Sequence, residues 1–211
     1  MDWFKPIDGY CERIDPSFWA EPVNAITNLA FIIAGWFACK QVKKTSSETR
    51  YLWLLPILMM AIGIGSFLFH TFANLWSLLA DVIPIYIFQL VFLYQYSRKV
   101  LLWSMLSTLG LFVIYFALTF LIPKLDIPLH GGQMYLSTLL LLMVLPFLKR
   151  PMVKYLLIAS VVFALSLTFR TIDQWSCHYW SWGTHGFWHC LNAVVLWICW
   201  YVIYLNTRHK I

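Results

Sequence analysis

Seven long apolar runs, separated by short polar breaks, constrain this chain more strongly than any other feature of its sequence. They cover roughly residues 23–39, 51–70, 77–97, 100–122, 132–148, 152–170 and 185–205. About 20 apolar residues are needed to cross the roughly 30 Å hydrocarbon core of a bilayer, so 211 residues leave room for seven spans but not for a separate soluble domain. Because 61% of the residues are hydrophobic and 11% are charged, a soluble fold of this size could not bury the apolar surface. The sequence therefore predicts an all-α, polytopic membrane protein folded as a seven-transmembrane helix bundle.

We expect a single domain with three parts: an acidic N-terminal segment (1–22), the helix bundle (23–206) and a short cytoplasmic tail (207–211). Acidic residues precede the first run, unlike the basic start of a cleaved signal peptide, so this run is expected to remain as a span. The break between the second and third runs, residues 71–77, holds no charge and could be a tight re-entrant turn.

Lysine and arginine are distributed unevenly among the breaks, and this predicts an orientation. The loops after the first, third and fifth runs and the C-terminal tail hold Lys40, Lys43, Lys44, Arg50, Arg98, Lys99, Lys149, Arg150, Lys154, Arg208 and Lys210. The opposite side holds Lys5, Arg13, Lys124 and Arg170. Because basic loops stay in the cytoplasm, the N-terminus is predicted outside or lumenal and the C-terminus cytoplasmic. This asymmetry explains the net charge of +6, so no nucleic-acid partner is expected.

A few polar side chains lie inside or at the ends of the runs, where each costs on the order of 2.5–3.5 kcal/mol at mid-bilayer. Ser66 and His70 are four residues apart near the end of the second run, and Asp81 lies early in the third. His185 and His189 open the seventh run with the same spacing, which places them on one helical face.

These residues together favour a metal site. Two histidines four apart offer two imidazoles to one metal, and a third from another helix completes a three-ligand catalytic set. If the spans alternate, His70, Asp81, His185 and His189 lie at the same membrane depth. Taken singly, each histidine is more often an interfacial residue, Ser66 a small packing residue and Asp81 a helix cap or half of an ion pair. Their paired spacing at one depth favours zinc.

At these residues the sequence resembles the alkaline ceramidase family, within a superfamily of seven-span hydrolases that includes adiponectin-receptor-like proteins. The blocks that carry the resemblance occur in order along most of the chain: 8–28 with Cys11-Glu12 and Glu21-Pro22-Val23-Asn24, Gly65-Ser66 to His70, Asp81, Asp173 to Cys177, and His185 to His189. The spacing between Cys11 and Glu21 departs from the family pattern.

The resemblance implies roles for individual residues. His70, His185 and His189 would hold zinc, with Ser66 and Asp81 beside it. The N-terminal segment would bind calcium through oxygen donors, for which Asp8, Glu12, Asp15, Glu21 and Asn24 are available. Such a carboxylate-rich run suits a cation that takes six to eight oxygens, and the alternative is a solvated acidic segment.

Cys11 and Cys177 are both predicted on the outer side. In an oxidising compartment they could form a disulfide, as the resemblance also implies, whereas in a reducing one they would be free thiols. Arg170 and Asp173, three residues apart, are expected to form an ion pair.

The function expected from these features is zinc-dependent hydrolysis of a lipid amide, with ceramide or a related N-acyl lipid and water as substrates. Asp81 would act as general base and acid, and Ser66 would stabilise the oxyanion or position the water. An alternative with the same site is a phospholipid acyl-ester hydrolase of the lipid-remodelling type. Another is a non-enzymatic seven-span lipid-binding receptor with structural zinc, for which a fourth ligand such as Cys190 would be needed. No obligate protein partner is expected, and the sequence does not identify the membrane.

Overall fold

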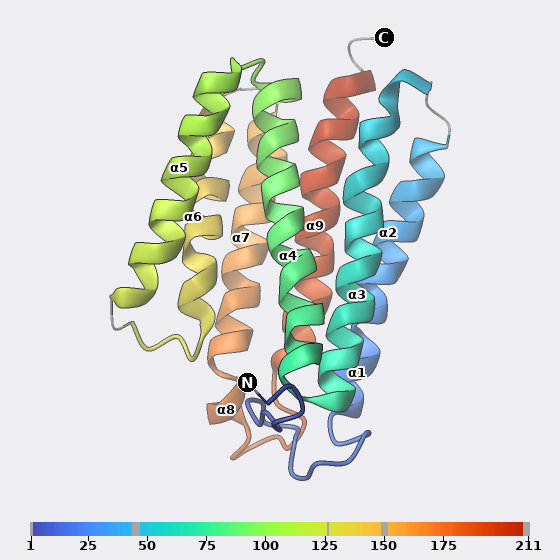
Figure 1. Cartoon of the computed structure of the whole chain (residues 1–211), viewed down its shortest axis with the longest axis vertical. Coiled ribbons are helices and arrows are strands. Elements are labelled where there is room, and N and C mark those ends of the chain that lie inside the picture. Colours follow the sequence, from blue (N-terminus) through green and yellow to red (C-terminus); the bar gives the residue numbers. More distant parts are fainter. Residues whose placement is uncertain (1, 44–46, 126, 149–151, 209–211) are drawn as a thin grey trace.

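The computed structural model describes residues 2–43, 47–125, 127–148 and 152–208, and in these ranges helices pack side by side along one axis (Figure 1). The α-helices are α1 (Pro22–Thr27), α2 (Leu29–Val42), α3 (Leu54–Phe72), α4 (Leu75–Gln95), α5 (Met105–Leu121), α6 (Leu136–Val144), α7 (Val153–Thr171), α8 (Asp173–Ser176) and α9 (His185–Arg208). Shorter helical turns are η1 (Ser47–Trp53), η2 (Tyr96–Val100), η3 (Ile122–Lys124), η4 (Gly132–Tyr135) and η5 (Leu145–Leu148).

Six helical segments within the described ranges are long and apolar enough to cross a membrane. They are Pro22–Val42, Thr49–Phe72, Leu75–Val100, Met105–Lys124, Val153–Thr171 and His185–Arg208. A shorter apolar segment, Gly132–Leu148, corresponds to the fifth run. The all-helical, multi-span part of the prediction is confirmed, while the count of seven crossings and the orientation stay predictions.

The outer surface of α5 shows what surrounds the bundle. Leu106, Val113 and Phe120 follow at intervals of seven residues, which places them on one face of the helix. They are 80%, 68% and 67% exposed, respectively. Soluble proteins rarely expose such a continuous apolar surface, whereas lipid tails favour it.

Helix α9 lies at the centre of the packing and contacts α2, α3, α4 and α7. A close approach between α3 and α4 depends on Gly65, because a Cβ atom there would lie 2.0 Å from the carbonyl oxygen of Ala80. Only glycine fits at this distance. The contact therefore places Ser66, the next residue on α3, opposite Asp81, the next residue on α4.

The uncharged break at 71–77 is a tight turn between α3 and α4. Ala73 takes a left-handed conformation with φ of 41°, and Asn74 caps α4 by accepting a hydrogen bond from the Ser77 backbone N–H at 3.2 Å. The N-terminal segment lies across this turn, since the Ile7 N–H donates to the Ala73 carbonyl at 2.7 Å.

The two ends of the bundle differ in charge. The acidic N-terminal segment lies at the same end as the α3–α4 turn and the start of α9 (Figure 1). Basic residues lie at the opposite end: Lys40 is in the last turn of α2, Lys99 follows α4, Lys154 is in the first turn of α7 and Arg208 ends α9. Lys44, Lys149, Arg150 and Lys210, which also support the predicted orientation, lie outside the described residues.

Candidate metal centre

Three histidines from two helices converge at the acidic end of the bundle. His70 lies in the last turn of α3, and His185 and His189 lie one turn apart at the start of α9. One ligand atom from each lies within 4.8 Å of the others, and the three residues are only 1–2% exposed. The structure thus brings together the three histidines singled out in the sequence.

Two of these imidazoles are oriented by hydrogen bonds at Nδ1. His70 Nδ1 donates to Glu21 Oε2 at 2.6 Å, and His70 Nε2 is buried without a partner. His189 Nδ1 lies 2.9 Å from the Thr27 hydroxyl, whose own hydrogen is directed to the Val23 carbonyl at 2.8 Å. The hydroxyl therefore accepts from His189. Both partners place the proton on Nδ1 and leave the Nε2 lone pair free, as an outer-shell partner of a metal ligand does.

The third imidazole, His185, is held by stacking. The ring of Tyr10 lies on it with 3.9 Å between centroids, and His185 Nδ1 is buried without a hydrogen-bond partner. Burial raises the pKa of Tyr10 to about 12, so this phenol stays neutral. Three close histidines, two of which have a buried ring nitrogen without a hydrogen-bond partner, fit zinc, which takes neutral imidazole ligands.

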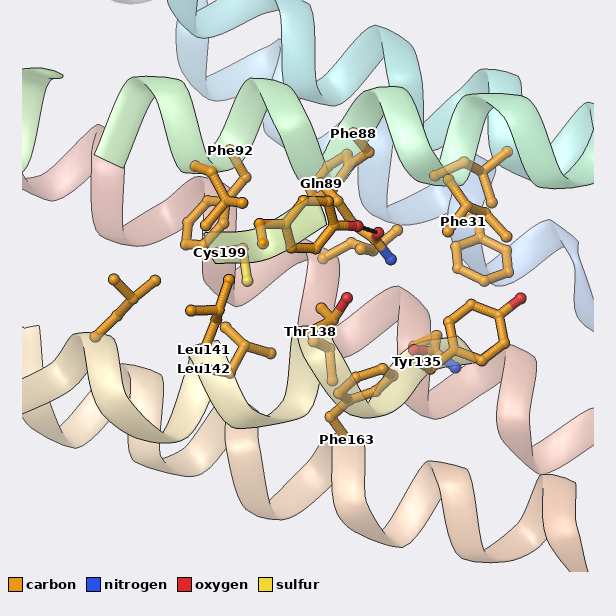
Figure 2. A pocket seen from close by; sticks show the side chains of 18 of the residues that line it. Phe31, Phe88, Gln89, Phe92, Tyr135, Thr138, Leu141, Leu142, Phe163 and Cys199 are labelled. Carbon is orange, nitrogen blue, oxygen red and sulfur yellow. Dashed lines mark hydrogen bonds between the residues drawn. The ribbon is translucent and has the colours of Figure 1, made fainter. Parts of the chain in front are cut away.

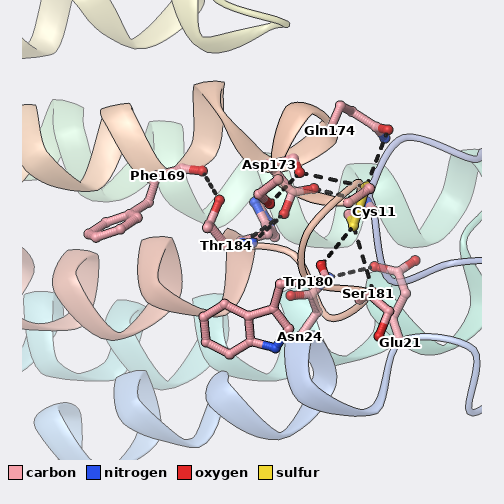
Figure 3. The surroundings of a disulfide bond; sticks show 12 residues. Cys11, Glu21, Asn24, Phe169, Asp173, Gln174, Trp180, Ser181 and Thr184 are labelled. Carbon is pink, nitrogen blue, oxygen red and sulfur yellow. Dashed lines mark hydrogen bonds between the residues drawn. A yellow bond between two sulfur atoms is a disulfide. The ribbon is translucent and has the colours of Figure 1, made fainter.

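The start of α9 is fixed by Asp173 (Figure 3). Its Oδ1 accepts the backbone N–H groups of Thr184 and His185 at 2.7 and 2.9 Å, and its Oδ2 accepts the Cys11 N–H at 2.9 Å. The sequence predicted an ion pair between Asp173 and Arg170, and this prediction is wrong, because both carboxylate oxygens bond backbone N–H groups. Its carboxylate caps a helix N-terminus, where both the free N–H groups and the helix dipole favour a negative charge.

A disulfide joins Cys11 to Cys177, whose Cα atoms are 5.4 Å apart (Figure 3). It connects the N-terminal segment to the loop that precedes α9. Gly183 is required beside it, because its φ is +65° and a Cβ atom would lie 2.7 Å from Cys11 Cβ. Because Tyr10 directly precedes Cys11, the disulfide also holds the Tyr10 ring over His185.

Ser66 and Asp81 lie at the same end of the bundle. Ser66 is 3% exposed, and its hydroxyl hydrogen-bonds the Asp81 carboxyl group. The other carboxyl oxygen, Asp81 Oδ1, is buried without a partner. Asp81 also interacts electrostatically with His70 and Arg170. A buried carboxyl group with one free oxygen, close enough to His70 to interact with it electrostatically, can bind or transfer a proton.

Arg170 is a further residue of the site that the sequence interpretation did not assign to it. Its guanidinium lies 5.6–5.8 Å from the ring centroids of Tyr10, Tyr135 and Trp188, and its Nε is buried without a hydrogen-bond partner. The three aromatic rings stabilise the cation. The Nε–H group remains available to donate a hydrogen bond. The only sequence signal was a basic residue near the end of an apolar run.

An apolar cavity lies inside the bundle, and some of its lining residues are neighbours of the histidines (Figure 2). Near the site it is lined by Trp188, between the two α9 histidines, and by Phe31, whose ring lies 6.3 Å from that of His189. Along α9 the lining continues to Cys199, a distance of roughly 16 Å at 1.5 Å per residue. Such a cavity can hold a hydrocarbon chain in the bundle beside the histidine cluster.

The calcium site implied by the family resemblance finds no support in the structure. The five candidate residues are Asp8, Glu12, Asp15, Glu21 and Asn24. Among the described residues, the histidine triad is the group of three or more His, Cys, Asp or Glu side chains whose ligand atoms converge. Asp8 and Asp15 are exposed, and both Glu12 oxygens accept backbone N–H groups, those of Val23 and Asn24, at 2.7 and 2.8 Å. The Glu12 carboxylate therefore caps the start of α1 rather than binding a cation.

Glu21 has partners at both oxygens as well. Oε1 accepts from Arg13 Nε at 2.5 Å, and Oε2 accepts from His70 and from the Asn24 amide at 3.1 Å. Burial alone would raise the pKa of Glu21, but the bonds to His70, Arg13 and Asn24 outweigh it and the pKa lies below its usual value. Glu21 is thus an ionised carboxylate that orients His70. Arg13 is a basic residue within the acidic segment, and its presence in the sequence could have indicated that Glu21 pairs with a cation of the protein rather than with calcium.

Comparison with known proteins is consistent with this arrangement. No curated protein gives a significant match to the chain. The family model described as Ceramidase matches residues 9–211, which is nearly the whole sequence and includes every residue of the histidine site. The family resemblance inferred from the sequence blocks is confirmed, and the chain belongs to the ceramidase family.

Proposed function

We propose that this ceramidase-family protein is a zinc-dependent intramembrane lipid amide hydrolase that cleaves the N-acyl bond of ceramide or a related lipid and releases a fatty acid. One observation carries the proposal: three buried histidines, one of which interacts with a buried carboxyl group that has a free oxygen, adjoin residues that line an apolar cavity. An amide linked to a long hydrocarbon chain is the kind of substrate that such a junction accommodates.

His70, His185 and His189 are the residues that would hold zinc. When bound at three histidines, zinc supplies Lewis acidity that polarises a carbonyl and lowers the pKa of a water to roughly 7. Glu21 and Thr27 keep the proton of His70 and of His189 on Nδ1, so that both imidazoles bind through Nε2.

Asp81 acts as the general base and then as the general acid. Its free Oδ1 accepts the proton of the attacking water and returns it to the departing amine, a role typically worth about 10²–10⁴ in rate. The Ser66 hydroxyl has one hydrogen, which it donates to the Asp81 carboxyl group to fix its orientation or turns toward the oxyanion that develops on the carbonyl oxygen.

The acyl chain lies in the cavity between α3, α4, α6, α7 and α9. Each methylene buried there contributes roughly 0.8 kcal/mol to binding, so chain burial supplies most of the affinity. Arg170, with unused donors close to Asp81, orients the oxygen atoms of the lipid head group.

We further propose that the chain crosses the membrane seven times with its N-terminus outside or lumenal. The gathering of basic residues at the end of α2, after α4 and at the start of α7 favours this orientation. The short segment Gly132–Leu148 would then be the fifth span.

A receptor with structural zinc is the less favoured candidate. A structural zinc usually has four protein ligands, and Cys190, the fourth donor suggested by the sequence, is exposed rather than directed into the histidine cluster. Amide and ester hydrolysis differ in the lipid from which fatty acid is released.

The proposal is tested by incubating the purified protein, with its zinc content measured, with ceramide and with a phospholipid of the same acyl chain. Release of fatty acid from ceramide in excess of that from the phospholipid is expected. Equal or greater release from the phospholipid would assign the protein to ester hydrolysis, and no release from either lipid by the zinc-loaded protein would contradict a hydrolase.

A further inference from the structure

Arg13 is a cation buried inside the acidic N-terminal segment. Its side chain is 5% exposed, although it belongs to a segment with no regular helix and lies two residues from an exposed aspartate. A guanidinium is rarely buried unless its donors are paired, so its partners identify its role.

The partners are four oxygen atoms from three parts of the chain: the loop at 15–17, Glu21 and the end of α3. Nε donates to Glu21 Oε1 at 2.5 Å. One terminal nitrogen donates to the backbone carbonyls of Asp15 and Ser17 at 3.2 and 3.5 Å, and the other donates to the carbonyl of His70 at 3.1 Å. One carboxylate and three carbonyl oxygens around a positive charge are the ligand types that calcium takes in proteins.

The oxygens that remain could not complete a calcium shell. Both Glu12 oxygens accept backbone N–H groups, and the second Glu21 oxygen accepts from His70 and Asn24. Asn24 Oδ1 is buried without a partner, but a single neutral oxygen falls far short of the six to eight that calcium takes.

We propose that the guanidinium of Arg13 takes the place of a bound calcium ion, so that this chain holds its N-terminal segment on the metal centre without calcium. The arginine links the loop at 15–17 to α3 by donating to the His70 carbonyl. Its ion pair with Glu21 holds that carboxylate in contact with the His70 ring. Arg13 is thus a positioning residue that acts on His70 through Glu21. The inference does not depend on which bond the protein hydrolyses.

The first test uses the full-length wild-type protein. Calcium binding measured by calorimetry and the melting temperature measured in calcium and in a calcium chelator should show no saturable binding and no shift. Saturable calcium binding that raises the wild-type melting temperature would overturn the proposal. Neither readout involves hydrolysis, so a protein without amidase activity would leave this test intact.

The second test replaces the arginine. Arg13→Ser leaves Glu21 as a buried charge with fewer partners, and the melting temperature should fall by something on the order of 10 °C. The substitution also opens a space lined by the Glu21 carboxylate and three carbonyls, so calcium should now raise the melting temperature. Lys5→Ala, which removes an exposed cation from the same segment, should change neither quantity.

An Arg13→Ser protein that is as stable as the Lys5→Ala control, or one that calcium fails to stabilise, would contradict the proposed role of the guanidinium. Arg13→Lys provides a further comparison. One ammonium group cannot reach all four oxygens that the planar fork reaches, so Arg13→Lys should recover only part of the lost stability.

Discussion

The Nδ1 atom of His70 lies 2.6 Å from a carboxylate oxygen of Glu21, which joins the end of α3 to the residue before α1. Both side chains are at most 2% exposed. A carboxylate that accepts from Nδ1 fixes the imidazole tautomer and raises its basicity toward a metal at Nε2.

Glu21→Gln should therefore weaken zinc binding by about 10- to 100-fold while the helices remain folded. Competition with a zinc chelator measures the affinity, and circular dichroism monitors the fold. Glu12→Gln is the matched control, because Glu12 is also buried but bonds only backbone N–H groups of α1. Equal zinc affinity in wild type and Glu21→Gln would mean that this contact does not support a metal ligand.

His189→Ala should lose zinc and lipid hydrolysis together, because two histidines and a solvent ligand hold zinc far less tightly than three histidines. Metal analysis of the purified variant and fatty-acid release from ceramide are the two measurements. His178→Ala, at an exposed histidine in the loop before α9, should retain both. Retained zinc with lost hydrolysis would instead assign His189 a direct catalytic role.

Asp81→Asn should keep zinc and lower the turnover rate by about 10²–10⁴, the usual contribution of a general base. Ser66→Ala should have a smaller effect, since the carboxylate that it orients remains. The rate at saturating lipid is the quantity to measure, with zinc content as the control. An Asp81→Asn protein that turns over lipid at the wild-type rate would remove the general-base assignment.

Val195→Trp should shorten the cavity and so discriminate against long acyl chains. Val195 is 3% exposed and lines the cavity. Excluding about four methylenes at roughly 0.8 kcal/mol each corresponds to about a 200-fold loss of kcat/KM for a long chain relative to a short one. Val194→Trp is the matched control, because the adjacent valine faces outward and is 46% exposed. The same chain-length profile in both variants would show that the acyl chain binds elsewhere.

Removing the disulfide by Cys11→Ser with Cys177→Ser should destabilise the protein by about 2–5 kcal/mol. At roughly 2–4 °C per kcal/mol for a chain of this size, the melting temperature should fall clearly, and a reducing agent should produce the same fall in wild type. Cys190→Ser, at an exposed free cysteine, serves as the control. Unchanged melting of the double variant would indicate that the other contacts of Asp173 suffice to hold the segment.

The sequence by itself determined the membrane-spanning helices and the histidine cluster. Hydropathy is a local property, because each apolar run must satisfy its own backbone inside the lipid. Once the runs alternate in direction, His70 must lie at the same end as His185 and His189, and their spacing by one helical turn fixes the shared face. Which residues of two continuous helices lie close together can therefore be predicted from the sequence.

The tertiary structure alone decided what the residues of the irregular segments do. The acidic N-terminal segment suggested calcium by composition, yet Arg13, folded back beside Glu21, fills that role, and Glu12 caps a helix instead. Asp173 likewise bonds the start of α9 rather than pairing with Arg170. A carboxylate bonds whichever donors the folded chain brings near it, and outside a helix no periodicity in the sequence specifies those donors.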